Sequence, residues 1–341
     1  MSVKKIAQLS GVSRGTVDRV LNHRGKVKPS TQERVMAAVD ALGYQPNLLA
    51  KSLATKGARG FQYIGVLVSA DGNPFFDDVL KGVSGKMREI EDFGFKMLLE
   101  TDVRFDAARQ LEVIDKLAER GIQGLIISPV NHPDISRRLT ELRRGGLPVV
   151  CVNTDVEDRT RDLYVGSDYH RCGRVAAELF GLLADGRAEK LAIIPGSLMV
   201  LGHDLRVRGF KSVAQWFENL TIVDVRENHD NDELSYRVTR DILTRNPDLT
   251  GIFFCAAGIG GGLKALEEFG KLGVIRVVTV DLIDVVRQNM MNYNITATIC
   301  QEPEKQGREA VSVMFDMLLT GRGRGADIVT ETQVMLKNSL L

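Results

Sequence analysis

Several patterns that mark membrane proteins, secreted proteins and metalloproteins are missing from this sequence. Its 341 residues hold no apolar run near the roughly 18–20 residues that a membrane-spanning helix requires. The N-terminus has neither the apolar segment nor the cleavage site of a signal peptide, so we expect a cytoplasmic protein with no membrane contact. The four cysteines and five histidines show no Cys-x-x-Cys, His-x-x-His or His-Glu-x-x-His spacing. The sequence therefore predicts reduced core cysteines and neither a metal site nor a cofactor.

Charge is unevenly distributed along the chain. Residues 1–60 carry eleven basic and three acidic side chains, an excess of +8, and the remainder carries −7 because the whole chain has a formal charge of +1. A basic head on an acidic body is typical of a protein whose head binds a polyanion. A basic solvated surface would have the same composition, so the sequence pattern of the head has to decide.

The head begins with two short predicted helices. Ser2 can cap a first helix with apolar positions Ile6 and Leu9, and a tight turn follows at Gly11. Ser13 can cap a second helix whose apolar face, at i, i+3 and i+4 spacing, is Val17, Val20 and Leu21. Its opposite face carries Arg14, Gly15, Asp18 and Arg19. Two helices joined by a glycine-containing turn form a helix-turn-helix, and arginines on the second helix can read guanine edges or hold phosphates.

A third helix completes the head. Ser30 and Glu33 have capping-box spacing at its start, and Gly43 is placed to end it. Its apolar stripe is Val35, Ala38, Val39 and Leu42. Three helices in about 45 residues provide a core of nearly the smallest size that folds.

Two segments of this head, VKKIAQLSGVSRGTVDRVLN (residues 3–22) and ERVMAAVDALGYQPNLLAKSLAT (residues 33–55), closely resemble the headpiece of the LacI/GalR repressors. The resemblance implies a DNA-binding headpiece over residues 1–45, and a hinge helix with linker over 46–60 whose Leu53 wedges into the minor groove. One departure is Asp18, where the family usually has Ser, and it leaves the operator sequence open. The implied DNA contacts are Ser13, Arg14, Gly15, Thr16, Arg19, Asn22, Asn47, Leu53 and Ala54.

The remainder, residues 61–341, alternates short apolar segments with helical stretches. This alternation predicts doubly wound α/β architecture with parallel sheets, and the length allows two lobes. The predicted strands lie at 63–68, 95–99, 125–127, 149–152, 191–194, 222–225, 252–255, 277–280 and 296–300.

The resemblance to LacI/GalR regulators continues through this region, and it implies the bilobed fold of the ribose-type periplasmic binding proteins. In that fold the chain crosses between lobes three times, which we expect near Ser167, Tyr293 and Ile328. The expected lobe 1 then covers approximately residues 61–166 and 294–327, and lobe 2 covers 167–293 and 328–341. Together they form the effector-binding and dimerisation domain.

Candidate ligand contacts follow the predicted strands, because ligands of open parallel sheets bind at the carboxyl ends of the strands. Residues 73–76 read Asn-Pro-Phe-Phe, which is similar to an element of ribose-type binding proteins in which Asn binds hydroxyls and Phe stacks on the sugar. The family's ligand-binding arginine aligns best with Arg206. The full set of expected contacts is Asn73, Phe75, Phe76, Ser128, Asn153, Arg206, His229, Asp281 and Gln301.

The sequence departs from the family after the predicted strand 252–255. Relatives often have an Asn-Asp pair there, whereas residues 256–262 read Ala-Ala-Gly-Ile-Gly-Gly-Gly. Bare amides at a helix N-terminus suit an anion, so an anionic sugar derivative is an alternative effector; glycines that only allow close helix packing are the other interpretation. A nicotinamide-dependent enzyme is a distant alternative, because Gly-x-Gly-x-x-Gly would need glycine at Leu263 and no acid–base pair or nucleophile motif is present.

These observations predict a sequence-specific DNA-binding regulator, most simply a repressor, that is controlled by a small sugar or polyol. A transport-associated binding protein would need a signal peptide and no DNA-binding head. We expect a homodimer on a near-palindromic operator. A tetramer is not expected, because the C-terminal residues 333–341 leave no room for a heptad helix.

Overall fold

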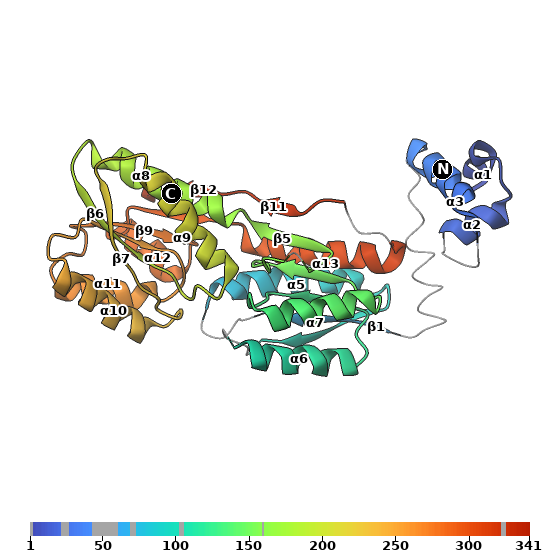
Figure 1. Ribbon diagram of the computed structural model, residues 1–341, viewed down its shortest axis with the longest axis horizontal. Coiled ribbons are helices and arrows are strands. Elements are labelled where there is room, and N and C mark those ends of the chain that lie inside the picture. The colour runs from blue at the N-terminus through green and yellow to red at the C-terminus, as the bar shows by residue number, and fades with distance from the viewer. Residues whose placement is uncertain are drawn as a thin grey trace.

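A computed structural model describes residues 3–21, 27–42, 61–68, 73–101, 106–158, 160–321 and 325–341 (Figure 1). The head is a bundle of α1 (Val3–Ser10), α2 (Arg14–Leu21) and α3 (Pro29–Ala41). Its core confirms most of the predicted apolar stripes and consists of Ile6, Val17, Val20, Val35, Ala38 and Val39. Leu9 was expected to belong to the apolar face of the first helix, but its side chain is 59% exposed. Of Ile6 and Leu9, only Ile6 lies on the face of α1 that packs against α2 and α3.

The ends of the head helices test two predicted caps. The hydroxyl of Ser13 accepts a hydrogen bond from the amide of Thr16 at 3.1 Å, which confirms it as the cap of α2. The predicted capping box of the third helix is wrong. The amides of Thr31 and Gln32 donate to the carbonyl of Lys28, so α3 begins at Pro29 and Ser30 is already inside its first turn. Proline suits this first position because its missing N–H is not needed there. The predicted stop at Gly43 and the hinge at 46–60 lie outside the described residues.

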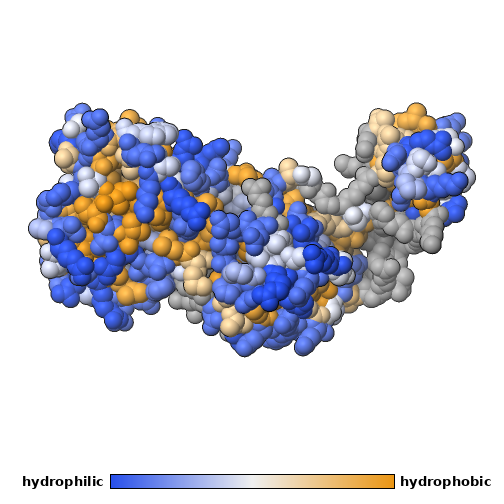
Figure 2. All heavy atoms as spheres, viewed as in Figure 1, coloured by the Kyte–Doolittle hydropathy of each residue, from blue (hydrophilic) through white to orange (hydrophobic). Residues whose placement is uncertain are grey.

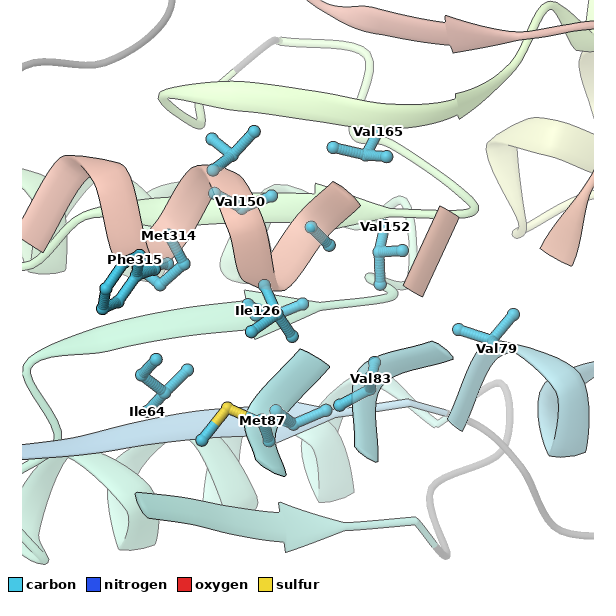
Figure 3. Packing of buried hydrophobic residues seen from close by; sticks show 14 of the residues in the cluster. Ile64, Val79, Val83, Met87, Ile126, Val150, Val152, Val165, Met314 and Phe315 are labelled. Atoms are coloured by element: carbon cyan, nitrogen blue, oxygen red, sulfur yellow. The ribbon is translucent and has the colours of Figure 1, made fainter. Parts of the chain in front are cut away.

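Lobe 1 is a parallel six-stranded sheet with helices on both faces (Figure 1). The strands in spatial order are β11 (Ile328–Thr330), β5 (Leu163–Ser167), β4 (Val149–Val152), β3 (Gly124–Ile127), β1 (Gln62–Leu67) and β2 (Phe95–Glu100). One face packs on α5 (Phe75–Glu91) and α13 (Pro303–Thr320), and the other on α6 (Ala107–Glu119) and α7 (Pro133–Arg144). Figure 3 shows side chains of the central strands, such as Ile126 and Val150, pointing at Met87 and Met314 of the covering helices.

Lobe 2 repeats this architecture with one antiparallel strand at its edge. The order is β12 (Gln333–Met335), β10 (Ala297–Cys300), β9 (Arg276–Val280), β8 (Gly251–Phe254), β6 (Glu189–Ile194) and β7 (Leu220–Val225). Its helices are α8 (Tyr169–Ala184), α9 (Leu201–Ala214), α10 (Asp232–Arg245), α11 (Ile259–Glu268), α12 (Asp284–Met291) and the 3₁₀ helix η1 (Lys337–Leu340). In the view of Figure 2, apolar side chains gather on this lobe and polar ones cover most of lobe 1. Two doubly wound parallel lobes are the predicted fold class.

Two of the three expected crossings between lobes need correction. The first crossing follows Ser167, as expected. The second was expected near Tyr293, but β10, which begins at residue 297, pairs with β9, so the chain stays in lobe 2 until Gln301. Likewise β11 pairs with β5 of lobe 1, and the last crossing follows Thr330 instead of preceding Ile328. Lobe 1 is therefore built from residues 62–167 and 303–330. The chain cannot leave a sheet before the strand that is hydrogen-bonded into it is complete.

Paired glycines allow close backbone contact between α5 and α13, two helices of lobe 1 that begin at the lobe boundary. A Cβ on Gly82 of α5 would overlap the carbonyl of Glu304 on α13, and a Cβ on Gly307 would overlap the carbonyl of Val79. Gly173 of α8 and Gly209 of α9 make the same contact in lobe 2. The spacing of each pair fixes where the first turns of these helices lie, and residues in the first turns of α5, α8 and α9 line the pocket described below.

We therefore expect Gly82→Ala to lower the free energy of unfolding of lobe 1 by about 2–4 kcal/mol, because neither backbone can move away from the added methyl group. Gly85→Ala is the matched control in the same helix, where a Cβ meets nothing within 4 Å. It should raise the stability by about 0.5–1 kcal/mol, since alanine is the better helix former. Urea unfolding followed by circular dichroism measures both. Equal effects of the two substitutions would contradict the close packing.

Candidate functional site

A pocket lies between the lobes at the carboxyl ends of their strands, with about 850 Å³ of empty space including the solvent at its mouth. The structure brings eight of the nine predicted ligand contacts to this pocket: Asn73, Phe75, Phe76, Ser128, Asn153, Arg206, Asp281 and Gln301.

The ninth, His229, does not line the pocket, and its neighbour Asp230 does. Both residues adopt left-handed backbone conformations, with φ of 48° and 53°. The resulting tight turn places Asp230 inward, where its carboxylate accepts a hydrogen bond from the amide of Ala257 at 3.1 Å. Counting positions after a strand cannot resolve such a turn, which explains the error of one residue.

Sequence reasoning missed three other polar residues of the pocket, Thr154, Tyr169 and His203. Tyr169 comes directly after the first crossing, two residues beyond the end of β5. It could have been found by the rule that selected the other contacts, because it too follows a strand of the sheet. His203 lies in the first turn of α9, for which the sequence has no such marker.

Backbone turns at the strand ends aim two polar side chains inward. Asn153 after β4 has φ of 66°, and Asp281 after β9 has φ of 64°. Asn and Asp tolerate this left-handed region better than other non-glycine residues. Each strand therefore ends in a residue that reverses the chain and presents a short amide or carboxylate to the pocket.

The apolar wall of the pocket comes from lobe 1. The rings of Phe75 and Phe76 meet edge to face, 5.4 Å apart with an interplanar angle of 87°. The side chain of Asn73 accepts from the amide of Phe75 at 3.2 Å, which fixes Asn73 beside the first turn of α5. Among the described residues, the Asn73 amide group donates to no acceptor, so the wall offers ring faces next to one hydrogen-bonding group.

The polar floor comes from lobe 2 and holds donors and acceptors with unused capacity. Arg206 is 3% exposed, donates to the carbonyl of Cys255 at 2.9 Å and packs 4.5 Å from the ring centre of Tyr169. Gln301 donates to both carboxylate oxygens of Asp281, at 2.9 and 3.1 Å. Within the described residues, Nε of Arg206 and Oε1 of Gln301 are buried without a hydrogen-bond partner. Buried polar atoms are nearly always paired in proteins, so these atoms point to a polar ligand.

The electrostatics of the floor are set by one cation and two carboxylates. Burial raises the pKa of the Asp281 carboxyl to about 6, with the nearby Arg206 guanidinium and the Gln301 hydrogen bonds opposing the rise and Asp230 adding to it. Burial lowers the pKa of the His203 imidazole, which favours its neutral form. The pocket is lined by the guanidinium of Arg206 and by the carboxyl groups of Asp230 and Asp281, so these three groups together give it no net positive charge.

Hydrogen bonds join the lobes beside the pocket. The side-chain amide of Asn153 donates to the Tyr169 hydroxyl at 2.6 Å, and the backbone amide of Gly202 donates to the Thr154 hydroxyl at 3.2 Å. Each contact pairs one residue of lobe 1 with one of lobe 2. The pocket is therefore formed by both lobes together and depends on the angle between them.

Two amides of the glycine-rich loop at 256–262 already donate to carboxylates of the protein. The amide of Gly261 donates to the carboxylate of Asp232 at 3.0 Å, and that of Ala257 donates to Asp230. A Cβ on Gly261 would overlap the carbonyl of Asp232, and one on Gly262 would overlap the ring of Phe254. The glycines therefore serve close packing of α11 on α10 and β8. Carboxylates therefore already lie at this helix N-terminus, which disfavours an anionic ligand there.

The second helix of the head presents its predicted DNA-facing residues to solvent. Ser13, Arg14, Gly15 and Arg19 are exposed, and Thr16 is half-buried. Nε of Arg19 donates to the carbonyl of Gly15 at 3.2 Å, which holds the guanidinium along the helix surface. The other expected contacts, Asn22, Asn47, Leu53 and Ala54, lie outside the described residues.

Over the described residues, no group of three His, Cys, Asp or Glu side chains could hold a metal ion. Within the same ranges, no helix combines the length and apolarity needed to cross a bilayer.

A helix-turn-helix head joined to a two-lobed α/β domain with a pocket between its lobes defines a DNA-binding transcriptional regulator with a small-molecule-binding domain. Residues 64–323 match the periplasmic binding protein domain, and residues 2–47 match bacterial regulatory proteins of the lacI family. The chain belongs to the LacI family of regulators and carries a periplasmic-binding-protein domain.

Relatives of known function agree with this assignment. The chain is 27% identical to the HTH-type transcriptional regulator MalR of Clostridium butyricum, over 99% of both chains. It is 28% identical to the ribose operon repressor of Halalkalibacterium halodurans, over 79% of this chain and 76% of the relative. The crystal structure of GanP, a glucose-galactose binding protein from Geobacillus stearothermophilus, superposes with a TM-score of 0.75 at 25% identity, covering 82% of this chain and 99% of that one. A relative that spans 99% of the chain is a regulator, which argues against the nicotinamide-dependent enzyme.

Proposed function

We propose that this regulator acts as a repressor whose operator affinity is controlled by a neutral sugar or polyol bound between the lobes. The observation that carries the proposal is the pocket itself. Its aromatic wall at Phe75 and Phe76 faces a polar floor in which buried atoms of Arg206 and Gln301 have no protein partner. Ring faces contact the C–H surfaces of a sugar, while guanidinium, amide and carboxylate groups bind its hydroxyls.

A neutral effector fits the charges better than an anionic one. Asp230 and Asp281 both line the pocket, against the single guanidinium of Arg206. A carboxylate or phosphate on the ligand would be repelled by at least one of these side chains. The names of two relatives, a ribose operon repressor and a glucose-galactose binding protein, also refer to neutral sugars.

Calorimetry on the full chain tests the ligand class. We expect at least one of D-ribose, D-galactose, D-arabinose and myo-inositol to bind with micromolar affinity. The matched anions, D-ribose 5-phosphate and D-galacturonate, should bind at least about 100-fold more weakly, a difference near 3 kcal/mol. Tight binding of an anion with no binding of its neutral counterpart would overturn the proposal.

The DNA-binding side of the function is tested in α2. We expect Arg19→Ala to weaken binding of a palindromic duplex, selected by the wild-type chain from a random library, by about 10- to 100-fold, because an exposed guanidinium on the groove-facing helix is lost. Fluorescence anisotropy at several salt concentrations measures the affinity and its salt dependence. Arg144→Ala, an exposed arginine of lobe 1, makes the same charge change and should leave the affinity within about twofold. Equal losses in the two variants would mean that only net charge matters.

The functional unit we propose is a cytoplasmic homodimer on operator DNA, with Leu53 of each copy at the centre of the site. Its support is the helix-turn-helix itself. One recognition helix reads too few base pairs for a specific operator, and two copies related by a two-fold axis match a near-palindromic site.

A further inference from the structure

A cluster of buried polar groups lies where the chain passes between the lobes. Ser167 ends the strand before the first crossing, Gln301 begins the second, and Thr330 ends the strand before the third. Gln306, in the second turn of α13, completes the cluster. All four residues are at most 5% exposed. We call Ser167, Gln301, Gln306 and Thr330 the crossing cluster.

The backbone carbonyl of Gln301 is the centre of the crossing cluster. It accepts from Nε2 of Gln306 at 2.7 Å and from the hydroxyl of Thr330 at 2.9 Å. These two donors fill both lone pairs of the carbonyl. The hydroxyls of Ser167 and Thr330 lie 2.8 Å apart, and Ser167 donates in this pair when Thr330 donates to the carbonyl. The Ser167 hydroxyl also lies 3.5 Å from the same carbonyl. One hydrogen-bond network therefore ties all three crossings together.

Gln301 also belongs to the ligand pocket through its side chain. Its Nε2 donates to Asp281, and its Oε1 has no partner among the described residues. The two ends of one residue thus face the ligand and the crossings. The next residue, Glu302, has φ of 55° and its carboxylate accepts from the amide of Glu331 at 3.0 Å, which links the second crossing to the third again.

We propose that Gln306 and Thr330 are positioning residues, which hold the carbonyl of Gln301 and thereby couple ligand contact at its side chain to the angle between the lobes. Neither lines the pocket. A change of lobe angle has to alter backbone torsions at the crossings, and therefore moves the Gln301 carbonyl against donors that belong to lobe 1. The crossing cluster restricts the lobes to few arrangements, and a bound hydroxyl on Oε1 of Gln301 favours one of them.

The coupling part of this inference rests on the proposed ligand-controlled DNA binding, whereas the restriction of the lobe angle does not. The first experiment therefore needs neither ligand nor DNA. Spin labels on p-acetylphenylalanine at position 144 in lobe 1 and position 237 in lobe 2 leave the native cysteines untouched. Double electron–electron resonance on the full chain then gives the distribution of interlobe distances.

Thr330→Val keeps the shape of the side chain and removes its donor, and Gln306→Met does the same for the amide. We expect both to widen the distance distribution at least about 1.5-fold relative to wild type. Thr330→Ser restores the hydroxyl and should restore the wild-type width. Thr239→Val is the matched control, because Thr239 is fully buried in lobe 2 and, among the described residues, its hydroxyl has no hydrogen-bond partner.

The second experiment uses D-ribose as the probe and measures by how much it changes the affinity for the selected operator duplex. We expect this factor to shrink at least about fivefold in Thr330→Val and Gln306→Met, and to stay within twofold of wild type in Thr330→Ser and Thr239→Val. Absence of any D-ribose effect in wild type would count against that sugar as the effector, and the distance distributions would decide the inference alone.

Three results would overturn the inference. Thr330→Val and Gln306→Met could both keep the wild-type distance distribution, Thr330→Ser could be as impaired as Thr330→Val, or Thr239→Val could widen the distribution equally. If Gln306→Met fails to fold, the comparison of valine with serine at position 330 decides. Ser167→Ala, which removes the hydroxyl next to Thr330 and leaves both short hydrogen bonds to the Gln301 carbonyl in place, should then fall between them.

Discussion

Replacing Arg206 with methionine is expected to weaken ligand binding strongly while the head keeps its affinity for non-specific DNA. Arg206 is the cation of the polar floor, and its unpartnered Nε is available to a ligand hydroxyl. A hydrogen bond to a charged donor contributes about 1.5–3 kcal/mol, so we expect a loss of about 10- to 100-fold in affinity for whichever neutral sugar binds the wild type. Isothermal titration calorimetry measures it.

Arg208→Met is the matched control, two residues further along α9. Arg208 contacts the carboxylates of Asp204 and Glu157 at the surface and does not line the pocket. Surface ion pairs contribute about 0–1 kcal/mol, so the ligand affinity should change less than about fivefold. If Arg208→Met and Arg206→Met lose the same affinity, the guanidinium of Arg206 is not a ligand contact and the effect belongs to α9 as a whole.

The parts of the fold that could be predicted are those that depend on local periodicity. Short apolar runs separated by amphipathic stretches gave the parallel strands, since strand and helix periods are read from neighbouring residues. The lobe to which residues 297–300 belong could not be derived in this way. The lobe assignment depends on the pairing of β10 with β9, and the four residues of β10 do not indicate the strand with which they pair.

The candidate site also has a part that the sequence predicts and a part that it does not. Asp281 and Gln301 follow strands directly and Asn73 comes six residues after the end of β1, so the position of a strand end predicts the approximate position of such residues. The glycines at 258–262 were open to two interpretations because their neighbour, Asp232, comes from another helix whose position only the folded chain defines. The sequence therefore predicts which residues lie at the rim of the pocket. Which protein groups bind their charges and hydrogen-bonding atoms can be seen only in the tertiary structure.

Asp281→Asn is expected to weaken ligand binding and, at the same time, to stabilise the protein above pH 6. Burial raises the pKa of this carboxyl from 3.8 to about 6, so the folded state binds a proton more tightly than the unfolded state does. The stability that the protonated carboxyl contributes is fully present below about pH 4 and is lost as the pH rises through about 6. A shift of two units corresponds to roughly 3 kcal/mol, and we expect a gain nearer 2 kcal/mol because the pocket admits water to the ionised group. Asparagine also suits the left-handed backbone at this position and can exchange hydrogen bonds with an inverted Gln301 amide.

The measurement is urea unfolding of wild type and variant between pH 4 and pH 8, with the difference between the two curves as the quantity of interest. We expect no difference at pH 4, a rise between pH 4 and 6, and a constant gain above that. Asp284→Asn, an exposed carboxylate three residues further on, removes the same charge and should show no such rise. Ligand affinity should fall at least about 10-fold in Asp281→Asn, since the ionised carboxylate accepts ligand hydroxyls more strongly than an amide does. A variant that is less stable than wild type at every pH would show that the Asp281 carboxylate is held by its partners more strongly than burial disfavours it, and an unchanged ligand affinity would remove Asp281 from the binding site.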